Sequence, residues 1–500
     1  MESFCGRIPE VKLHRAPNSS VGAGDTPFYA SLIAFALLLS ASAAFAQLPP
    51  NVVKALADAG IPDSAIGVVV QPLDALKPTL SVGGNTAMNP ASTMKLLTTF
   101  AALELLGPAY TWQTEIWATA TPKNNGVLEG DLYIKGGGDP KLTYEHFWRL
   151  LRQTHDAGIS EIRGGIIQDR SAFSVEAIAP GDFDGQPLRP YNVRPDALLL
   201  NFNAITLTLA AEANTVRVTA EPHPANLHIY NRLSVNHHAT ACGEWRKALN
   251  AELQPGHTQM RLKLSGSYPA VCNEQQWNMA AMTNVDHVGG VFNALWGEIS
   301  GKEKLHPARE GTVPENAQKI ASLSSPTLGE VVRDINKYSN NVMARQLLLT
   351  LGMNAGPRPA RVADGEAAIR AWMLARGLNF PELVIDNGAG LSRIERISAA
   401  NMVRLLAAAW NSAVMPELMA SLPIVAVDGT MKKRLKENGI VGQAHIKTGS
   451  LDGIKTMAGY VLDKNGRRWA LAFMVGHPNA AQSGAAQDAL LEWVYGGGAL

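Results

Sequence analysis

The chain has 500 residues, of which 46% are hydrophobic and 17% charged, so it is long enough to form two or three domains with sizeable cores. Its 44 Lys and Arg residues stand against 43 Asp and Glu residues, which leaves a formal net charge of +1 without a basic run. This balance argues against nucleic acid as a partner and against a polybasic membrane patch.

The first 46 residues have the pattern of a signal peptide. Residues 28–40 form an apolar core too short to span a bilayer, and residues 44–46 (AFA) before Gln47 form a small-x-small cleavage site. The pattern predicts export to the periplasm, with no stable membrane anchor after cleavage. Asp25 precedes the apolar core, and the n-region is unusually long. A start codon assigned too early explains this form, and an uncleaved N-terminal anchor is the alternative.

Two short strands, at residues 66–70 and 79–82, are predicted before a helix with apolar residues at helical spacing from Met94 to Leu106. From about residue 110 to residue 272 the pattern changes to short alternating strands between Gly, Pro and Asn turns, with few long helices. We expect these strands at residues 127–135, 162–167, 200–209, 215–220 and 260–265.

Helical periodicity returns at residues 285–299 and dominates residues 328–422. A hairpin follows, with strands at 457–462 and 469–475 and a turn between them, and then a helix at 480–495.

Three cysteines are present, and Cys5 belongs to the predicted leader. In an oxidising compartment Cys242 and Cys272, about thirty residues apart, predict one disulfide that stabilises the fold by roughly 3 to 4 kcal/mol. Two buried free thiols are the alternative. Neither cysteine has partners at metal-ligand spacing and the twelve histidines are scattered, so we expect no metal and no cofactor.

The string at residues 92–95 (STMK) starts the first predicted helix, after a structure-breaking Asn-Pro. Because positions i and i+3 share a helix face, the Ser92 hydroxyl and the Lys95 amine can meet at hydrogen-bond range. A lysine kept neutral by burial or by a second cation can take the serine proton, and Lys447 is a candidate for that cation. Alone, such a string arises by chance about once in a chain of this length.

The string at residues 447–449 (KTG) lies on what we expect to be an edge strand next to the terminal hairpin. Lys447 and Thr448 can grip a carboxylate there, while Gly449 lets another backbone approach closely. The N–H group of Ser450 can donate to an oxyanion, beside that of the nucleophilic serine. A solvated strand lysine before a turn glycine is the alternative.

The string at residues 339–341 (SNN) lies within an amphipathic stretch, residues 328–351, that is predicted as helix. Its two asparagines interrupt good helix formers, which is costly without a purpose. Ser339 could relay a proton and the Asn341 amide could hold a peptide backbone. Solvent-facing polar residues on a helix are the alternative. A second register, with Tyr338 as the proton carrier, also fits and stays open.

Taken together and in this order, the three strings resemble the signature strings of the penicillin-binding proteins and serine β-lactamases. Within that superfamily the chain resembles the D-alanyl-D-alanine carboxypeptidase/endopeptidase group of the penicillin-binding protein 4 type, peptidase family S13. The long separation of Ser92 from Ser339 and the strings at residues 130–140 and 386–393 favour this group. The resemblance covers nearly all of the chain after residue 47.

The resemblance implies an α/β (α+β) catalytic domain of the serine β-lactamase/transpeptidase type. Because Ser92 and Lys447 lie on opposite sides of the β-rich region, we expect this domain to be discontinuous. Residues 47–109 and 284–500 would form it, and residues 110–283 would form an insertion of one or two small domains that overhangs the cleft.

The resemblance also implies a serine D-Ala-D-Ala carboxypeptidase, endopeptidase or both, acting on peptidoglycan stem peptides and inhibited by β-lactam antibiotics. Ser92 would form the acyl-enzyme with Lys95 as base, and Ser339 would protonate the leaving amine. In this family an acidic residue of the insertion is thought to meet the free amine of the peptide's diamino acid. Asp169 is the candidate here, with a surface turn aspartate as the alternative.

Two other functions remain open at this point. A β-lactamase or esterase would share all three strings, although the one E-x-x-x-N string, residues 274–278, precedes Ser339 and so stands in the wrong order for a class A deacylation loop. A penicillin-binding sensor without peptide turnover is the other. The balance of carboxypeptidase and endopeptidase action, and the existence of a homodimer, are left open too.

Overall fold

The computed structural model describes residues 47–177, 179–256, 259–437 and 439–498. The predicted signal peptide, including Cys5, lies outside these residues. Within the described ranges, no helix combines the length and the apolar character needed to cross a membrane.

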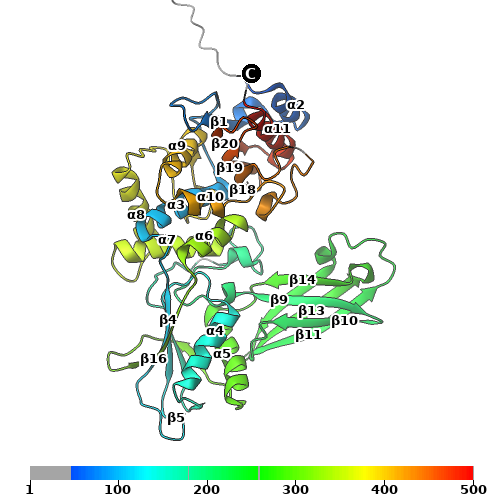
Figure 1. Cartoon of the computed structure of the whole chain (residues 1–500). Coiled ribbons are helices and arrows are strands. Elements are labelled where there is room, and N and C mark those ends of the chain that lie inside the picture. Colours follow the sequence, from blue (N-terminus) through cyan, green and yellow to red (C-terminus); the bar gives the residue numbers. More distant parts are fainter. Residues whose placement is uncertain (1–46, 178, 257–258, 438, 499–500) are drawn as a thin grey trace, which may run out of the picture. The chain divides into compact units, whose positions relative to one another are not determined.

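A five-stranded antiparallel sheet joins the beginning and the end of the described chain (Figure 1). The last strands of the described chain, β19 and β20, form the predicted hairpin, and β1 pairs along its whole length with β20. The order is β18 (Ala444–Leu451), β19 (Ile454–Leu462), β20 (Arg468–Gly476), β1 (Ile66–Pro72) and β2 (Leu80–Val82). Strand β18, which carries the KTG string, is therefore an edge strand.

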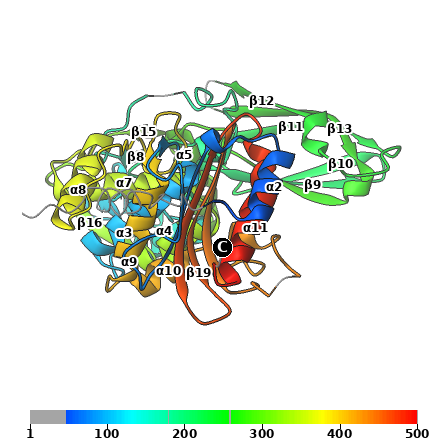
Figure 2. The same ribbon diagram turned by 90° about the horizontal axis from the view of Figure 1, so that it is seen from above.

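Helices cover both faces of this sheet (Figure 2). The strands are apolar on both sides: Val68 and Val70 pack into one core, whereas Val69 between them packs into the other. One face is covered by α2 (Pro50–Asp58) and α11 (Gly484–Tyr495). The core on the other face is built with α3 (Lys95–Leu106), α6 (Leu328–Lys337), α7 (Asn341–Ala355), α8 (Val362–Ala375), α9 (Ala399–Trp410) and α10 (Met415–Ser421).

A second five-stranded sheet lies in the first part of the insertion. Its order is β15 (Ala308–Glu310), β8 (Ile166–Asp169), β6 (Leu132–Gly136), β4 (Gln113–Ala118) and β16 (Gln318–Ser324). Two helices pack on it around Phe147 and Phe292, namely α4 (Tyr144–Asp156), which the sequence did not single out, and α5 (Asn284–Ser300).

The boundary predicted after residue 283 is therefore wrong. Helix α5 and strands β15 and β16 follow this residue in the chain but belong to the insertion, since both strands complete its sheet. The chain returns to the helices of the catalytic sheet only after Ser324. Helical periodicity identified α5 correctly but said nothing about which sheet the helix covers.

The second part of the insertion consists of two three-stranded sheets that share one hydrophobic core. Their orders are β10 (Thr215–Glu221), β9 (Ile205–Glu212), β14 (Glu274–Met279) and β11 (Leu227–Asn236), β13 (Met260–Pro269), β12 (Leu249–Pro255). Small paired strands elsewhere are β3 (Ala87–Met88) with β17 (Ile397–Ser398) and β5 (Val127–Leu128) with β7 (Glu161–Ile162).

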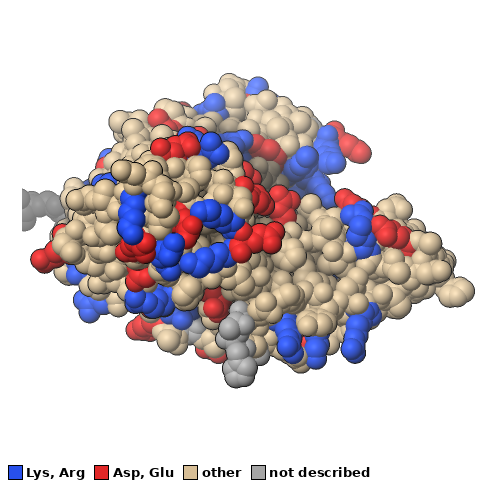
Figure 3. Space-filling view, turned by 90° about the horizontal axis from the view of Figure 1, so that it is seen from below, with Lys and Arg blue, Asp and Glu red and all other residues tan. Residues whose placement is uncertain are grey.

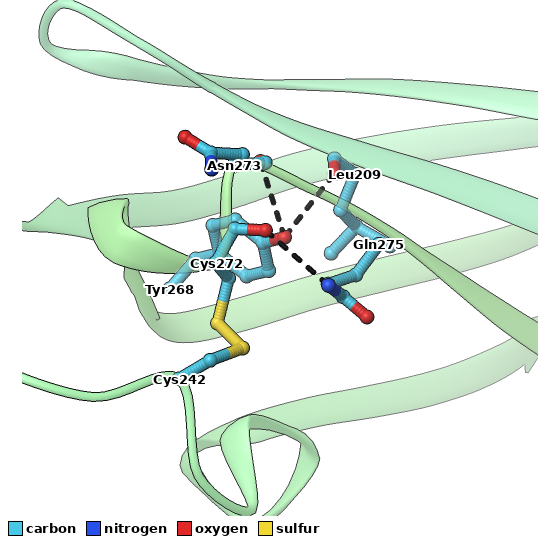
Figure 4. The surroundings of a disulfide bond; sticks show 6 residues. All are labelled: Leu209, Cys242, Tyr268, Cys272, Asn273 and Gln275. Carbon is cyan, nitrogen blue, oxygen red and sulfur yellow. Dashed lines mark hydrogen bonds between the residues drawn. A yellow bond between two sulfur atoms is a disulfide. The ribbon is translucent and has the colours of Figure 1, made fainter.

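Cys242 and Cys272 form a disulfide at the edge of this core (Figure 4). The buried Tyr268 hydroxyl beside it donates to the backbone carbonyls of Leu209 and Asn273, at 3.3 and 3.4 Å. The bridge thus ties the segment before β12 to the turn before β14. The E-x-x-x-N string lies on β14 itself, in the insertion.

Charges of both signs alternate over the face shown in Figure 3. Lys and Arg side chains there stand beside Asp and Glu side chains over much of the surface, in keeping with the net charge of +1.

Candidate active site

Ser92 lies in a 3-10 turn, η2 (Ala91–Met94), immediately before α3. The turn is fixed on both sides: the N–H group of Ala91 donates to Asn89 Oδ1 at 2.8 Å, and the Thr456 hydroxyl of β19 donates to the Pro90 carbonyl at 2.7 Å. Ala91 has a φ of +45°, an uncommon conformation for a residue with a side chain. Such local strain persists where the surrounding structure determines it, and it is frequent at active sites.

Lys95 is the first residue of α3 and is 0% exposed. Its Nζ atom lies 3.0 Å from Ser92 Oγ, donates to Asn341 Oδ1 at 2.7 Å, and donates to the carbonyl of Ala389. Burial lowers the pKa of Lys95 well below its usual value, and the positive charge of Lys447 lowers it further.

The three contacts of Lys95 can be made by either form of its amine. An ammonium donates to all three oxygens, whereas the neutral amine, which the lowered pKa favours, has two N–H groups and one lone pair, so it donates to two acceptors and receives one proton donor. Asn341 Oδ1 and the Ala389 carbonyl accept the two N–H groups, which leaves the lone pair for the Ser92 hydroxyl. The arrangement therefore suits a base that removes the Ser92 proton.

Ser339 lies in a turn between two helices, not within a helix over residues 328–351 as predicted. Helix α6 ends at Lys337, Ser339 has a φ of +56°, and α7 begins at Asn341. Asn340 caps α7, since its Oδ1 accepts from the N–H group of Met343 at 3.1 Å. The asparagine pair that interrupts the helix formers thus ends one helix and starts the next.

The structure places Ser339, and not Tyr338, beside the amine of Lys447. Lys447 Nζ donates to Ser339 Oγ at 2.8 Å. The Tyr338 side chain is 67% exposed, and its hydroxyl makes no hydrogen bond with the described residues.

Lys447 points inward from the edge strand β18 and is 0% exposed. Besides Ser339, its amine contacts the carbonyl of Thr448 at 2.7 Å, and burial lowers its pKa to about 7. The Thr448 hydroxyl is paired with that of Thr430 at 2.7 Å. A substrate carboxylate at this edge would meet Thr448 first, with the charge of Lys447 directly behind it.

Gly449 is required by the closeness of β18 to the nucleophile turn. A Cβ atom at this position would lie 2.8 Å from the backbone nitrogen of Ser92 and 2.3 Å from Thr456 Oγ1, which leaves no room for a side chain. The N–H group of Ser92 therefore lies beside the edge strand, and the next residue of that strand, Ser450, is exposed. A carbonyl oxygen bound here can meet backbone donors from both elements.

Five of the predicted residues thus come together around one amine–hydroxyl pair: Ser92, Lys95, Ser339, Asn341 and Lys447. They come from the turn before α3, from the α6–α7 junction and from β18. The cluster contains no histidine, so a lysine is the base available to the hydroxyl. Among the described residues, no three His, Cys, Asp or Glu side chains are close enough together to hold a metal ion.

Asp169 is not part of this cluster. It ends β8, is 3% exposed, and its carboxylate accepts from the Ser171 N–H group at 3.0 Å, from the Ser171 hydroxyl at 2.6 Å and from the Val313 N–H group at 2.9 Å. Asp169 is therefore neither a surface turn aspartate nor an open cleft carboxylate. Its contacts hold the end of β8, and we do not assign the substrate amine to it.

Two features of the site were missed by sequence reasoning. The string at residues 386–393 was singled out by resemblance, but its contribution, a carbonyl at Ala389 that accepts from Lys95, is a backbone group that no side-chain pattern reveals. Glu395, a buried carboxylate behind this string, carried no signal in the sequence.

Comparisons with known proteins agree on one family. Residues 48–495 match the model of the D-Ala-D-Ala carboxypeptidase 3 (S13) family. The chain is 28% identical to a D-alanyl-D-alanine carboxypeptidase of Actinomadura sp. (strain R39), over 95% of this chain and 91% of that protein. It is 25% identical to the D-alanyl-D-alanine carboxypeptidase DacB of Haemophilus influenzae, over 81% of this chain and 84% of that protein.

The fold also has a close counterpart among solved structures. Penicillin-binding protein 4 (dacB) of Haemophilus influenzae superposes with a TM-score of 0.74, over 89% of this chain and 100% of that chain. At 22% sequence identity this likeness establishes the fold, including the insertion.

Proposed function

The chain belongs to the D-Ala-D-Ala carboxypeptidase 3 (S13) family, and from this premise we propose that Ser92 is the nucleophile with which it cleaves peptidoglycan peptides ending in D-Ala-D-Ala. As a member of this family it is a serine-type D-Ala-D-Ala carboxypeptidase. The observation that carries the role of Ser92 is the fully buried Lys95 amine, 3.0 Å from the serine hydroxyl and held by two acceptors.

Acylation begins when Ser92 Oγ attacks the carbonyl carbon of the penultimate D-Ala and its proton passes to Lys95 Nζ. The N–H groups of Ser92 and Ser450 hold the oxyanion of the tetrahedral intermediate. The C–N bond then breaks, and the proton moves from Lys95 through Ser339 to the nitrogen of the departing D-Ala. Asn341 orients the peptide through its side-chain amide.

The carboxylate of the departing D-Ala is held by Thr448 and by the charge of Lys447 behind it. In the second half-reaction water attacks the acyl-enzyme, and Lys95 takes the proton of the water and returns it to Ser92 Oγ. Penicillins resemble the terminal D-Ala-D-Ala unit and acylate Ser92 in the same way, and this adduct turns over slowly because no class A deacylation glutamate follows the SNN string.

We further propose that residues 1–46 direct export and that the enzyme works in the periplasm. The apolar core at residues 28–40 and the cleavage site before Gln47 support this location, as does a substrate that lies outside the cytoplasmic membrane.

The test is to incubate the purified enzyme with cross-linked muropeptides and to analyse the products by mass. Loss of one D-Ala from pentapeptides is the expected product of carboxypeptidase action, and separation of cross-linked dimers is that of endopeptidase action. A Ser92→Ala variant should yield neither. If wild type leaves all muropeptides intact while penicillin still adds its mass to the protein, the enzyme is a penicillin-binding sensor; rapid release of hydrolysed nitrocefin without release of D-Ala would identify a β-lactamase.

We predict that Ser339→Ala slows acylation by roughly 10²-fold, the usual contribution of one positioned proton-transfer group, whereas Tyr338→Phe leaves it within a factor of about two. The reason is that the Ser339 hydroxyl contacts Lys447 while the Tyr338 side chain is exposed. The measurement is the rate of penicillin adduct formation by intact mass. Acylation lost only in the Tyr338→Phe variant would overturn the assignment in favour of the tyrosine.

A further inference from the structure

The loop at residues 386–391 lies directly behind the catalytic lysine. The Ala389 carbonyl accepts from Lys95 Nζ, and the Gly388 carbonyl accepts from the Thr98 hydroxyl of α3 at 2.7 Å. Gly390, with a φ of +81°, packs so closely on the nucleophile turn that a Cβ atom there would lie 1.8 Å from the Ala91 carbonyl oxygen. Movement of this loop would therefore displace the amine or the turn that carries Ser92.

One buried carboxylate holds the loop. Glu395 is 0% exposed, and its Oε1 atom accepts from three consecutive backbone N–H groups, those of Asp386 at 3.3 Å and of Asn387 and Gly388 at 3.0 Å. Three converging N–H groups form a binding concavity for an anion. Without the carboxylate these three donors, of which that of Gly388 is buried, would lose their acceptor.

The charge of Glu395 faces the same lysine. Its second oxygen, Oε2, is buried and has no hydrogen-bond partner among the described residues. Around Lys95, the cations Lys447 of β18 and Arg345 of α7 lower the pKa of the amine, whereas Glu395 raises it. The negative charge of Asp386, in the same loop, acts to raise the pKa of both Arg345 and Glu395. Burial raises the pKa of Glu395, while the three N–H groups favour its ionised form.

We propose that Glu395 is a positioning residue for acyl transfer: its carboxylate clamps the loop whose Ala389 carbonyl orients the Lys95 amine, and its negative charge lies directly behind that loop. This inference rests on the proposed function in one respect, namely that Lys95 is the base. Glu395 acts through the loop and through its field, because it is fully buried and has no access to the substrate.

The rival explanation is a purely structural one. The loop also has internal hydrogen bonds, since Asn387 Nδ2 donates to the Leu391 carbonyl and Asn387 Oδ1 accepts from the Ala389 N–H group. If these bonds alone fixed the conformation of the loop, loss of Glu395 would lower the Tm of the protein without any specific effect on the basicity of Lys95. The experiment must therefore separate the clamp from the charge.

Three variants of the full-length protein do so. Glu395→Gln keeps an oxygen for the three N–H groups but removes the charge, and Glu395→Ala removes both. Glu382→Gln is the matched control, because Glu382 also accepts from a backbone N–H group, that of Ser398 at 2.9 Å, and from Asn401 at 2.7 Å. For each protein we would measure the rate constant of benzylpenicillin acylation by intact mass across a pH series, together with Tm.

Glu395→Gln is expected to retain Tm but to acylate several-fold more slowly at neutral pH, since an amine made less basic is a weaker proton acceptor. The acid limb of its pH profile moves to lower pH. With a peptide substrate, the kcat of Glu395→Gln is expected to fall while its KM stays unchanged. Glu395→Ala is expected to lose at least about tenfold in rate at every pH as the loop is released. Glu382→Gln keeps the wild-type profile.

Each outcome bears on a defined part of the proposal. A Glu395→Gln rate and profile equal to wild type would overturn the electrostatic role, and a Glu395→Ala variant that acylates at the wild-type rate would overturn the clamp. A lower Tm with unchanged rates would leave Glu395 purely structural. If wild type itself forms no adduct at Ser92, the proposed function fails instead, and the two failures are thereby distinguished.

Discussion

A Lys95→Met variant is expected to acylate with benzylpenicillin roughly 10³-fold more slowly than wild type, because a positioned general base contributes about that much to such a step. Methionine nearly matches the length of the lysine side chain and suits a buried site, so the loss is chemical and not steric. The partner that Ser92 Oγ loses is the amine 3.0 Å away, and no other side chain of the described residues hydrogen-bonds to this hydroxyl. Adduct formation followed by intact mass measures the effect.

A Lys95→Arg variant is the matched control for charge. Guanidinium stays protonated at all accessible pH values and cannot accept the serine proton, although it places a permanent cation at this position. We therefore expect it to be as inactive as Lys95→Met. An arginine variant with near wild-type acylation would mean that Lys95 acts as a fixed charge, and a methionine variant within tenfold of wild type would remove the lysine from the mechanism.

The core of the site could be predicted because its geometry is local. Ser92 and Lys95 are three residues apart where the 3-10 turn η2 runs into α3, so local helical geometry alone brings them together. The terminal hairpin was equally clear, since strongly apolar strands flank an Asp-Lys-Asn-Gly turn. Both predictions rest on interactions within a few residues in the chain.

Predictions that depend on pairing between distant segments of the chain were less accurate. The insertion was expected to end at residue 283, yet β16 returns to pair with β4, some two hundred residues earlier in the chain. Asp169 looked free for a ligand because the sequence around it showed neither that its side chain is buried nor that the N–H group of Val313, 144 residues later in the chain, donates to it. Glu395 was missed for a different reason: its three donors lie only seven to nine residues earlier in the chain, but they converge on its carboxylate only in the folded loop.

The break between α6 and α7 could be predicted only in part. The sequence indicated that the two asparagines of residues 339–341 needed a reason, but a continuous amphipathic pattern on both sides favoured one helix. The structure ends α6 at Lys337 and begins α7 at Asn341, because Asn340 is a strong N-cap and Ser339 takes a left-handed conformation. Capping preference, applied to an interior position, would have predicted the break.

A Lys447→Met variant is expected to lose about 10²-fold in kcat/KM for a peptide with a free C-terminal carboxylate, the usual result of removing one partner of a buried charge pair. The loss has two physical sources. The carboxylate loses the cation behind Thr448, and Lys95 loses the neighbour whose charge helps to keep it neutral. Penicillin acylation falls as well, and the purified variant should retain a wild-type Tm, since methionine removes a buried amine without adding a polar group.

The same lysine sets a pH dependence whose sign follows from its environment. Burial lowers the pKa of Lys447 to about 7, so the free enzyme loses this cation as the pH rises through that value. The KM of a carboxylate-terminated peptide should therefore rise on the alkaline side, whereas kcat changes less, because the bound carboxylate restores the proton. A peptide with a C-terminal amide offers no charge and should show no such rise, nor should Lys447→Met with either peptide. An alkaline rise in KM shared by both peptides would assign the titration to another group.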